Sequence, residues 1–336
     1  MLLEVRDLTI EYRATRGRVR AVDGVSFDVP AGAVVGVVGE SGCGKTTAVR
    51  AITRVMPESA VFAAGSISLE GTDIVKLSDR DMRKRLWRDI AYIPQSAMNA
   101  LDPVWRVGKQ VEEVLVDRGG LSRKAARMRA EELFAMVGLE AKRLRDFPHQ
   151  FSGGMRQRAS IALALALSPK LVIADEPVTA LDVIIQRQVL DTFAELQKRL
   201  NLSVVLVTHD ISVVAYVCDH VVVMYAGKVV EAGPVAEVLA SPSHPYTMGL
   251  YNAFPELSGE DRDLSPIEGS PPDLLNPPKG CRFRVRCPFA QPICAEEPPE
   301  HIVGDGHRAL CHRATEAPNL RVAARQTKTW IGVTAE

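Results

Sequence analysis

The chain has 336 residues, and its 41 lysines and arginines balance its 41 aspartates and glutamates. This length exceeds one ordinary domain and allows a large core. A net charge of zero gives no electrostatic sign of a nucleic-acid partner, so we expect none. Residues 1–7 lack a signal-peptide pattern, and no apolar run approaches the roughly 18–20 residues that cross a bilayer. We therefore expect any membrane span to belong to another chain.

Strand-like and helix-like patterns alternate along the first two thirds of the chain. Residues 3–12 and 24–29 alternate as strands, and residues 33–38 form an apolar run typical of a buried strand. Further strands are predicted at 66–69, 90–93, 171–174 and 203–207, and helical segments at 47–52, 109–140, 153–167 and 183–200. Strands followed by helices indicate an α/β fold with a parallel core sheet.

A glycine-rich segment lies between the buried strand and the helix after it. Residues 39–46 match the phosphate-loop pattern G-x-x-x-x-G-K-[ST] at every fixed position. Glycines let backbone N–H groups turn inward around a phosphate, and the helix N-terminus adds partial positive charge. We expect Lys45 to reach the β- and γ-phosphates of ATP and Thr46 to coordinate Mg²⁺. The nucleotide-binding residues predicted here are Gly39, Ser41, Gly42, Gly44, Lys45, Thr46 and Thr47.

The apolar run at 171–174 delivers two carboxylates, Asp175 and Glu176, at its C-terminal end. Ligands of α/β sheets bind at that end of the strands. Asp175 is predicted to bind Mg²⁺ directly or through water. Glu176 is predicted to act as the general base that polarises the attacking water.

A Ser-Gly-Gly segment, residues 152–154, precedes the carboxylate strand. Ser152 is expected to cap a helix beginning near Met155, and the two glycines leave the backbone open to a phosphate. Taken alone, this is a weak pattern.

The motifs in their order resemble the ATP-binding subunits of ABC transporters. The ordered set consists of the phosphate loop, Gln95, the Ser-Gly-Gly segment, Asp175-Glu176, residues 180–182 and His209. The resemblance covers about residues 3–233. It implies a P-loop NTPase core of ABC type, with an antiparallel β subdomain and an inserted helical subdomain at about 96–165. We divide the chain into a nucleotide-binding domain at 1–240 and a Pro-rich, Cys-containing extension at 241–336.

The resemblance also implies roles for single residues. In that family two nucleotide-binding domains pair head to tail, with each ATP between the phosphate loop of one and the Ser-Gly-Gly segment of the other. Ser152, Gly153 and Gly154 would then belong to the nucleotide site, with Ser152 and Gly154 contacting the γ-phosphate held by the partner. Met155 stands where the family often has Gln, a change that leaves the phosphate-facing positions intact.

The remaining roles fall on four single residues. Gln95 would contact Mg²⁺ and the attacking water, and His209 would hold the γ-phosphate. Asp182 would act across the dimer seam. Tyr12 resembles the aromatic residue that stacks on adenine, and a half-exposed strand tyrosine is the competing interpretation.

Residues 94–104, 148–158, 176–183 and 243–247 resemble the oligopeptide/dipeptide permease branch. That branch implies ATP hydrolysis coupled to peptide import at the cytoplasmic face of the cell inner membrane, as a peripheral protein. Its expected partners are a second, related but non-identical ABC ATPase, two integral membrane permease subunits and an extracytoplasmic substrate-binding protein. There are two alternatives. The importer could carry another cargo, such as a nickel chelate or a sugar, or the chain could be a soluble ABC ATPase.

Four cysteines lie close together late in the chain. Cys281, Cys287, Cys294 and Cys311 read C-x5-C-x6-C-x16-C, and four thiols can surround a tetrahedral metal or an iron–sulfur cluster. The spacing is wider than the C-x2-C pair of structural zinc, and a proline follows Cys287. The resemblance implies a [4Fe–4S] cluster, with Zn²⁺ as the alternative and free thiols or disulfides as the third possibility. Its expected role is to staple a Pro-rich segment that has little apolar core.

Overall fold

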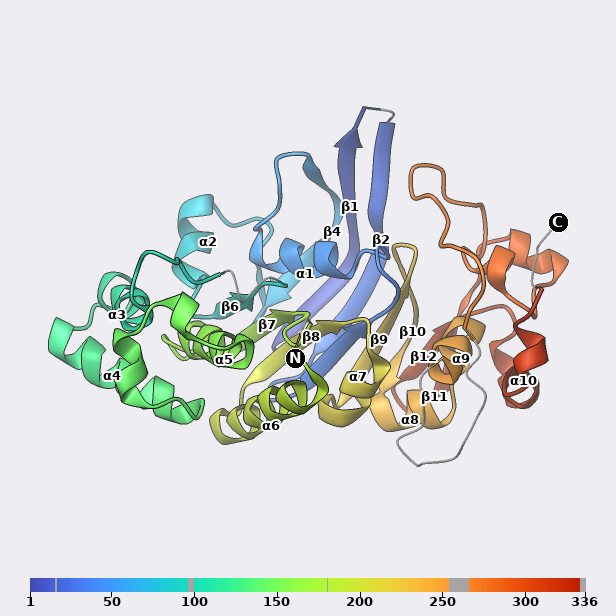
Figure 1. Cartoon of the computed structure of the whole chain (residues 1–336). Coiled ribbons are helices and arrows are strands. Elements are labelled where there is room, and N and C mark those ends of the chain that lie inside the picture. Colours follow the sequence, from blue (N-terminus) through green and yellow to red (C-terminus); the bar gives the residue numbers. More distant parts are fainter. Residues whose placement is uncertain (16, 96–99, 180, 254–265, 333–336) are drawn as a thin grey trace. The chain divides into compact units, whose positions relative to one another are not determined.

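The computed structural model describes residues 1–336 except 16, 96–99, 180, 254–265 and 333–336 (Figure 1). The chain forms two compact units. The first unit consists of residues 1–2, 29–34 and 73–207, and the second of residues 3–28, 35–72 and 208–336. Both units therefore draw on segments that lie far apart in the sequence.

The first unit contains a parallel sheet. Its strands are β6 (Ile90–Ile93), β7 (Leu171–Asp175) and β8 (Ser203–Thr208), and β7 pairs in parallel with both neighbours. Every residue of β7 and β8 is buried. Continuous apolar strands of this kind are typical of parallel sheets that are covered on both faces. The predicted strands at 90–93, 171–174 and 203–207 are confirmed.

Helices α3, α4 and α5 lie close together in the first unit (Figure 1). The helical block predicted at 109–140 is confirmed and consists of two helices, because the chain breaks at Gly119 and at Gly120, where φ is +70°. The helices of this unit are α2 (Asp79–Arg85), α3 (Val107–Asp117), α4 (Arg123–Met136), α5 (Gly153–Ala164) and α6 (Val183–Leu200), with short 3-10 turns at Ala141–Arg145 and Pro148–Gln150. None of the helices in the described ranges is long and apolar enough to cross a membrane.

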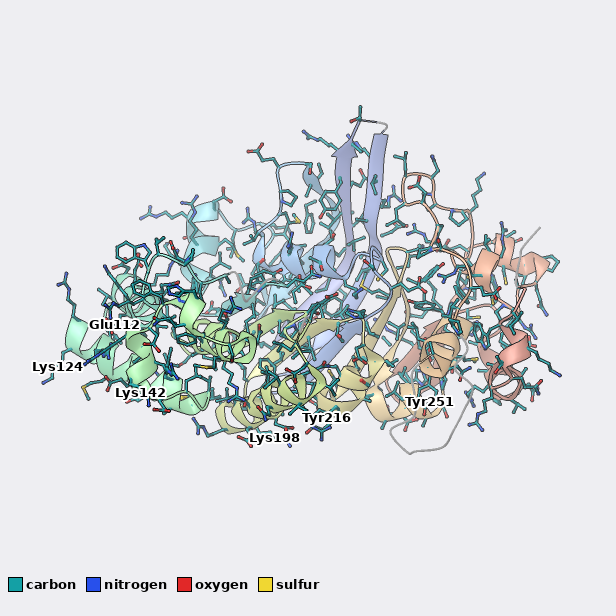
Figure 2. All side chains as sticks on the ribbon, viewed as in Figure 1. Glu112, Lys124, Lys142, Lys198, Tyr216 and Tyr251 are labelled. Carbon is teal, nitrogen blue, oxygen red and sulfur yellow. The ribbon has the colours of Figure 1, made fainter. Side chains whose placement is uncertain are left out.

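Charged side chains cover the outer helices of the first unit. Glu112 on α3 receives a 3.0 Å hydrogen bond from Arg127 of α4, which also binds Glu131 one turn later. Lys124 and Lys142 are exposed on the same group of helices (Figure 2). Beneath this polar exterior, α3 and α4 carry buried apolar side chains, among them Val111 and Leu133.

The second unit contains an antiparallel sheet built from β1 (Leu3–Ala14), β2 (Gly17–Val29) and β4 (Ala60–Leu69), in the order β2-β1-β4. A two-residue strand, β5 (Thr72–Asp73), follows β4 in the chain. The strand predicted at 66–69 is longer than its sequence pattern suggested, because most of its N-terminal half is only partly buried or exposed and carries no alternating signal.

A second sheet of this unit joins early and late parts of the chain. β3 (Val34–Val38) pairs in parallel with β9 (His220–Tyr225), and β9 pairs antiparallel with β10 (Lys228–Pro234). On the other side of β10 lies β12 (His307–Leu310), followed by β11 (Glu300–Gly304). Residues beyond 300 therefore belong to the same sheet as β3.

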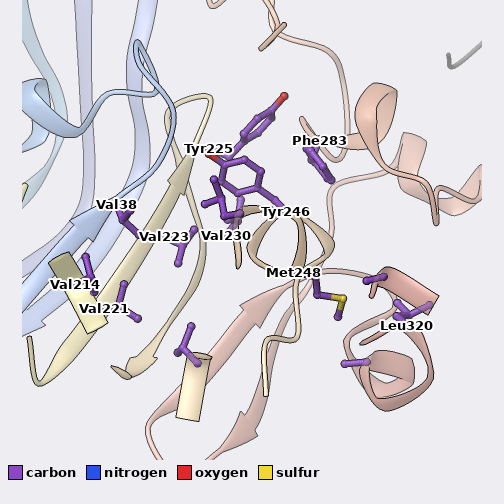
Figure 3. Close-up of a cluster of buried hydrophobic side chains, with 14 of the residues drawn as sticks. Val38, Val214, Val221, Val223, Tyr225, Val230, Tyr246, Met248, Phe283 and Leu320 are labelled. Atoms are coloured by element: carbon purple, nitrogen blue, oxygen red, sulfur yellow. The ribbon is translucent and has the colours of Figure 1, made fainter. Parts of the chain in front are cut away.

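A buried hydrophobic cluster packs against this sheet (Figure 3). Its centre is formed by three aromatic rings, with centroids 4.6 Å apart for Tyr225 and Tyr246, 5.2 Å for Tyr225 and Phe283, and 5.4 Å for Tyr246 and Phe283. The helices of this unit are α1 (Lys45–Thr53), α7 (Ile211–Val217), α8 (Val235–Ala240), α9 (Pro245–Asn252) and α10 (Ala317–Ala324), with 3-10 turns at Arg284–Arg286, Pro292–Ala295, Ala314–Glu316 and Thr327–Thr329. The helices α9 and α10 have eight residues each, and each has a proline in its first two positions, where the missing N–H is tolerated.

Candidate functional site

The phosphate loop runs from the end of β3 to the start of α1. Gly39 and Gly44 adopt φ values of +156° and +102°. A Cβ atom on Gly39 would lie 2.1 Å from the carbonyl oxygen of Met224, and one on Gly44 would lie 2.2 Å from that of Ala21. Only glycine fits these two positions, so the sequence pattern has a direct steric cause.

Lys45 reaches back into the loop that precedes it. Its side chain is buried, and Nζ donates hydrogen bonds to the carbonyl oxygens of Gly39 at 2.7 Å and Glu40 at 2.9 Å. Nζ also lies 3.8 Å from Sγ of Cys43. Burial raises the pKa of the Cys43 thiol, and the nearby ammonium group opposes this shift. The ammonium group of Lys45 is thus held inside the loop by its carbonyl oxygens.

Tyr12 and Thr47 meet beside the loop. The Tyr12 hydroxyl lies 3.1 Å from Oγ1 of Thr47, so the strand β1 is tied to the first turn of α1. Thr46 is partly buried at the same helix start. Stacking of Tyr12 on adenine stays a prediction.

Glu40, at a variable position of the phosphate-loop pattern, has partners that sequence reasoning missed. Its carboxylate accepts two hydrogen bonds from Arg286, and its N–H donates to the hydroxyl of Tyr246 at 2.9 Å. An acidic residue in a loop expected to bind phosphate is a sign that a basic side chain lies nearby, but the sequence does not say which one.

The two predicted carboxylates lie at the end of β7, in the first unit. Asp175 is fully buried, and its Oδ2 accepts a 2.8 Å hydrogen bond from the Tyr92 hydroxyl. Glu176 has a φ of +48°, a left-handed value rare for residues with side chains. Its Oε2 accepts hydrogen bonds from Nε2 of Gln95 and Oγ1 of Thr179, both at 3.0 Å. The structure therefore brings Gln95, Asp175 and Glu176 together.

Two helix caps hold the predicted trans-acting residues of the first unit. Ser152 caps α5 by accepting from Met155 N–H at 3.3 Å, so the predicted cap is confirmed and the helix begins two residues earlier, at Gly153. Asp182 caps α6 by accepting from Ile185 N–H at 3.0 Å. A Cβ on Gly154 would lie 2.4 Å from the Ile185 side chain, so the two caps are neighbours.

The remaining predicted positions are His209, the two loops after Gln95 and Thr179, and the segment around His244. His209 directly follows β8, belongs to the second unit and has an exposed side chain. Residues 96–99 of the branch-like segment 94–104, and Ala180 of the predicted 180–182 motif, lie outside the described residues. His244, in the branch-like segment 243–247, caps α9 by accepting a hydrogen bond from Tyr246 N–H at 3.0 Å. Burial lowers the pKa of His244 to about 3.

The four late cysteines line one small cavity together with His312 and Phe289; they are Cys281, Cys287, Cys294 and Cys311. All six cysteines of the chain are free thiols. Burial raises the pKa of Cys281 and Cys287, and that of Cys311 to about 12. In the part of the chain that the structure describes, no group of three or more His, Cys, Asp or Glu side chains is arranged to hold a metal ion. The iron–sulfur prediction thus lacks direct support and stays a prediction.

Comparisons with known proteins agree with the motifs. A family model described as ABC transporter matches residues 22–179, and one described as oligopeptide/dipeptide transporter, C-terminal region, matches residues 230–294. The oligopeptide transport ATP-binding protein OppD of Bacillus subtilis is 48% identical over 312 residues, which cover 91% of this chain and 87% of that protein. The dipeptide transport ATP-binding protein DppD of the same organism is 44% identical over 314 residues, which cover 92% of this chain and 94% of that protein.

A solved structure shows the same fold. It is the dimeric, post-hydrolysis state of an ATP-binding cassette bound to ADP and phosphate, which is 27% identical with a TM-score of 0.62. The match covers 69% of this chain and 98% of that chain. The predicted fold class, an α/β ATPase with parallel and antiparallel sheets, is confirmed. The chain therefore belongs to the ABC transporter family of ATP-binding proteins, in its oligopeptide/dipeptide branch.

Proposed function

We propose that this chain hydrolyses ATP to power the import of di- or oligopeptides through a membrane complex. The observation that carries the proposal is the arrangement at the end of β7, where Gln95 and Thr179 hold Glu176 beside the buried Asp175. Such a pair of carboxylates supplies a metal ligand and a base at the edge where α/β folds bind nucleotides. The similarity to peptide transport ATP-binding proteins supports the cargo.

Nucleotide binding begins at the phosphate loop. The N–H groups at the start of α1 and the ammonium group of Lys45 suit the β- and γ-phosphates. Phosphate oxygens would replace the loop carbonyls that Lys45 now contacts. Thr46 and Asp175 are oxygen donors of the kind that Mg²⁺ prefers, and Gln95 would complete this set; the metal would neutralise charge on the phosphates.

Hydrolysis needs a base near the attacking water. Glu176 would take a proton from that water as the water oxygen bonds to the γ-phosphorus and the bond to the ADP oxygen breaks. Gln95 orients the Glu176 carboxylate by its hydrogen bond, and His209 would stabilise the γ-phosphate.

A second ATPase subunit completes each site. Ser152, Gly153, Gly154 and Asp182 would face the nucleotide of the partner, and the dimeric state of the related cassette supports this arrangement. The side chains of Ser152 and Asp182 already accept hydrogen bonds from N–H groups in the first turns of α5 and α6, which fixes their positions. We propose that the partner is a related, non-identical chain.

The membrane-spanning part of the complex comes from other chains. We propose two integral permease subunits and an extracytoplasmic binding protein, with this chain peripheral on the cytoplasmic face. The names of the relatives, which are transport ATP-binding proteins, support these partners.

We also propose that the four cysteines of the small cavity hold a [4Fe–4S] cluster with a structural role. Thiolates are the ligands such clusters require, and all four cysteines line the same cavity. Iron bonds would tie together a segment that has few regular elements. Iron and sulfide analysis of anaerobically purified protein tests this, with zinc as the opposing result.

The decisive experiment is purification of the tagged chain from solubilised membranes, followed by reconstitution into vesicles with the proteins that accompany it. We expect two polytopic proteins and a second ATPase, with ATP turnover that rises when peptide and binding protein are added. Turnover that responds to a nickel chelate or a sugar would correct the cargo. Recovery with ribosomal proteins and no membrane protein would overturn the import function.

A further inference from the structure

Arg286 lies in the cysteine-bearing segment, residues 281–313, and binds the phosphate loop directly. Its Nη1 lies 2.8 Å from Oε2 of Glu40 and its Nη2 lies 3.0 Å from Oε1, so the pair is bidentate. The Arg286 side chain is 6% exposed, and that of Glu40 is 24% exposed. A partly buried, bidentate arginine–carboxylate pair fixes geometry as well as charge.

Three further groups hold the Arg286 guanidinium in place. Nε donates to the carbonyl oxygen of Glu268 at 2.9 Å, and Nη2 donates to that of Ile267 at 3.1 Å. Nη1 donates to the hydroxyl of Tyr225 at 3.2 Å, on a ring of the central aromatic group (Figure 3). Arg286 is thus bound on all sides, and the next residue, Cys287, lines the cavity of the four cysteines.

Glu40 is also bound through its backbone. Besides its carboxylate, its N–H donates to the Tyr246 hydroxyl at 2.9 Å, and its carbonyl oxygen accepts from Nζ of Lys45 at 2.9 Å. The backbone of this loop residue therefore lies between the extension and the lysine expected to bind phosphate. A shift of the Glu40 side chain would move the carbonyl oxygen that positions Lys45.

We infer that Arg286 is a positioning residue for the phosphate loop, and that the cysteine-bearing segment controls nucleotide affinity through it. The inference rests on the proposed function, because it assigns the loop to ATP. A loop held in its binding shape loses less conformational freedom when the phosphates arrive. The expected effect is therefore on nucleotide binding, with the hydrolysis step left to Glu176 and Gln95.

The test uses the purified transporter complex with Glu40→Gln, Arg286→Gln and the double variant. The dissociation constant of a non-hydrolysable ATP analogue is measured together with KM and kcat for ATP. Each single variant is expected to raise the dissociation constant and KM about fivefold, with kcat within about twofold of the wild type. The double variant is expected to match the worse single variant, because both changes break one contact.

Arg313→Gln is the matched control. Arg313 lies in the same segment, two residues after Cys311, and its side-chain bonds end on Glu316 and the carbonyl oxygen of Phe289. This variant is expected to keep the wild-type dissociation constant. A fivefold rise in Arg313→Gln as well would overturn the inference, since it would show a general loss of the segment.

The inference also fails if Glu40→Gln binds the analogue as tightly as the wild type, or if the effects of the two changes multiply in the double variant. Glu40→Gln leaves Arg286 and its main-chain bonds intact, so it decides the question even if Arg286→Gln does not fold. A wild-type complex that binds no ATP would contradict the proposed function itself, which is a separate outcome.

Discussion

The side-chain amide of Gln95 donates a 3.0 Å hydrogen bond to Glu176, a residue held at a left-handed φ of +48° directly after β7. Thr179 donates a second hydrogen bond to the same carboxylate oxygen. Two donors on one oxygen and an unusual backbone conformation fix the direction of the Glu176 side chain. Backbone strain of this kind costs free energy and persists where the surrounding structure enforces it.

Glu176→Gln is expected to keep ATP binding and to lower turnover by about a hundredfold or more, because an amide cannot accept the proton of the attacking water. Analogue affinity and steady-state ATP hydrolysis of the complex measure the two effects. Thr179→Val, which removes only one donor to Glu176, serves as the control and is expected to retain much more activity. Wild-type turnover in Glu176→Gln would remove Glu176 from the role of base.

Gly44→Ala is expected to abolish nucleotide binding, because the added Cβ would lie 2.2 Å from a backbone oxygen that cannot move aside easily. Gly42→Ala is the matched control: Gly42 also has positive φ, but its Cβ would meet no atom within 4 Å. The second change should cost only roughly 1–2 kcal/mol of backbone strain. Analogue titration and thermal unfolding distinguish the two, and equal losses would argue against the steric explanation.

Glu231→Gln is expected to lower the free energy of unfolding by about 3 kcal/mol, since removing one member of a buried charged network leaves its partners unsatisfied. The Glu231 carboxylate is 1% exposed and accepts from Ser243 N–H at 2.6 Å, from His244 N–H at 3.0 Å and from His307 Nε2 at 2.7 Å. Denaturant unfolding measures the loss.

Glu300→Gln is the control for that loss. The Glu300 side chain is about half exposed, and it pairs with Arg308 at the surface of the same sheet. Exposed pairs contribute at most about 1 kcal/mol. Equal destabilisation by both substitutions would show that burial of Glu231 is not the cause.

His244→Asn is expected to reduce the loss of stability in acid. Burial holds the pKa of His244 at about 3 in the folded chain, below the ordinary 6.5. As pH falls below 6.5, the unfolded chain gains a proton that the folded chain refuses, so the free energy of unfolding falls by up to about 1.4 kcal/mol per pH unit until pH 3. Asparagine keeps the helix cap and does not titrate.

Unfolding measured between pH 6.5 and pH 4.5 tests the His244 prediction. The slope of stability against pH should be shallower in the variant than in the wild type. Parallel slopes would mean that His244 is protonated in the folded chain.

The sequence predicted the elements with strong apolar runs most accurately. β6 and α6 have the predicted bounds, and β7 and β8 extend theirs by one residue, because buried strands and capped helices carry their signals locally. The break between α3 and α4 was missed, since helical spacing on both sides concealed two glycines.

In the candidate site, the spacing of the motifs predicted Gly39, Gly44 and the Ser152 cap correctly. Local backbone geometry explains why these residue types are needed there. The spacing could not predict the Arg286–Glu40 pair, because 246 residues separate the partners and neither belongs to a fixed motif position. The bond between Tyr92 and Asp175 was also missed, because 83 residues separate the two and Tyr92 belongs to no motif. Long-range polar contacts depend on the assembled fold rather than on neighbouring residues.

The pairing of β12 with β10 has a practical consequence for shortened forms of the chain. Glu231 and Ala232 of β10 lie opposite Ala309 and Arg308 of β12. A chain ending at residue 240 would leave one side of β10 as an open edge, with backbone groups free to pair with another molecule. Such a fragment would also lack Phe283 and Trp330, two buried members of the hydrophobic cluster. We expect it to aggregate, so activity missing from a shortened chain would say nothing about the ATP site.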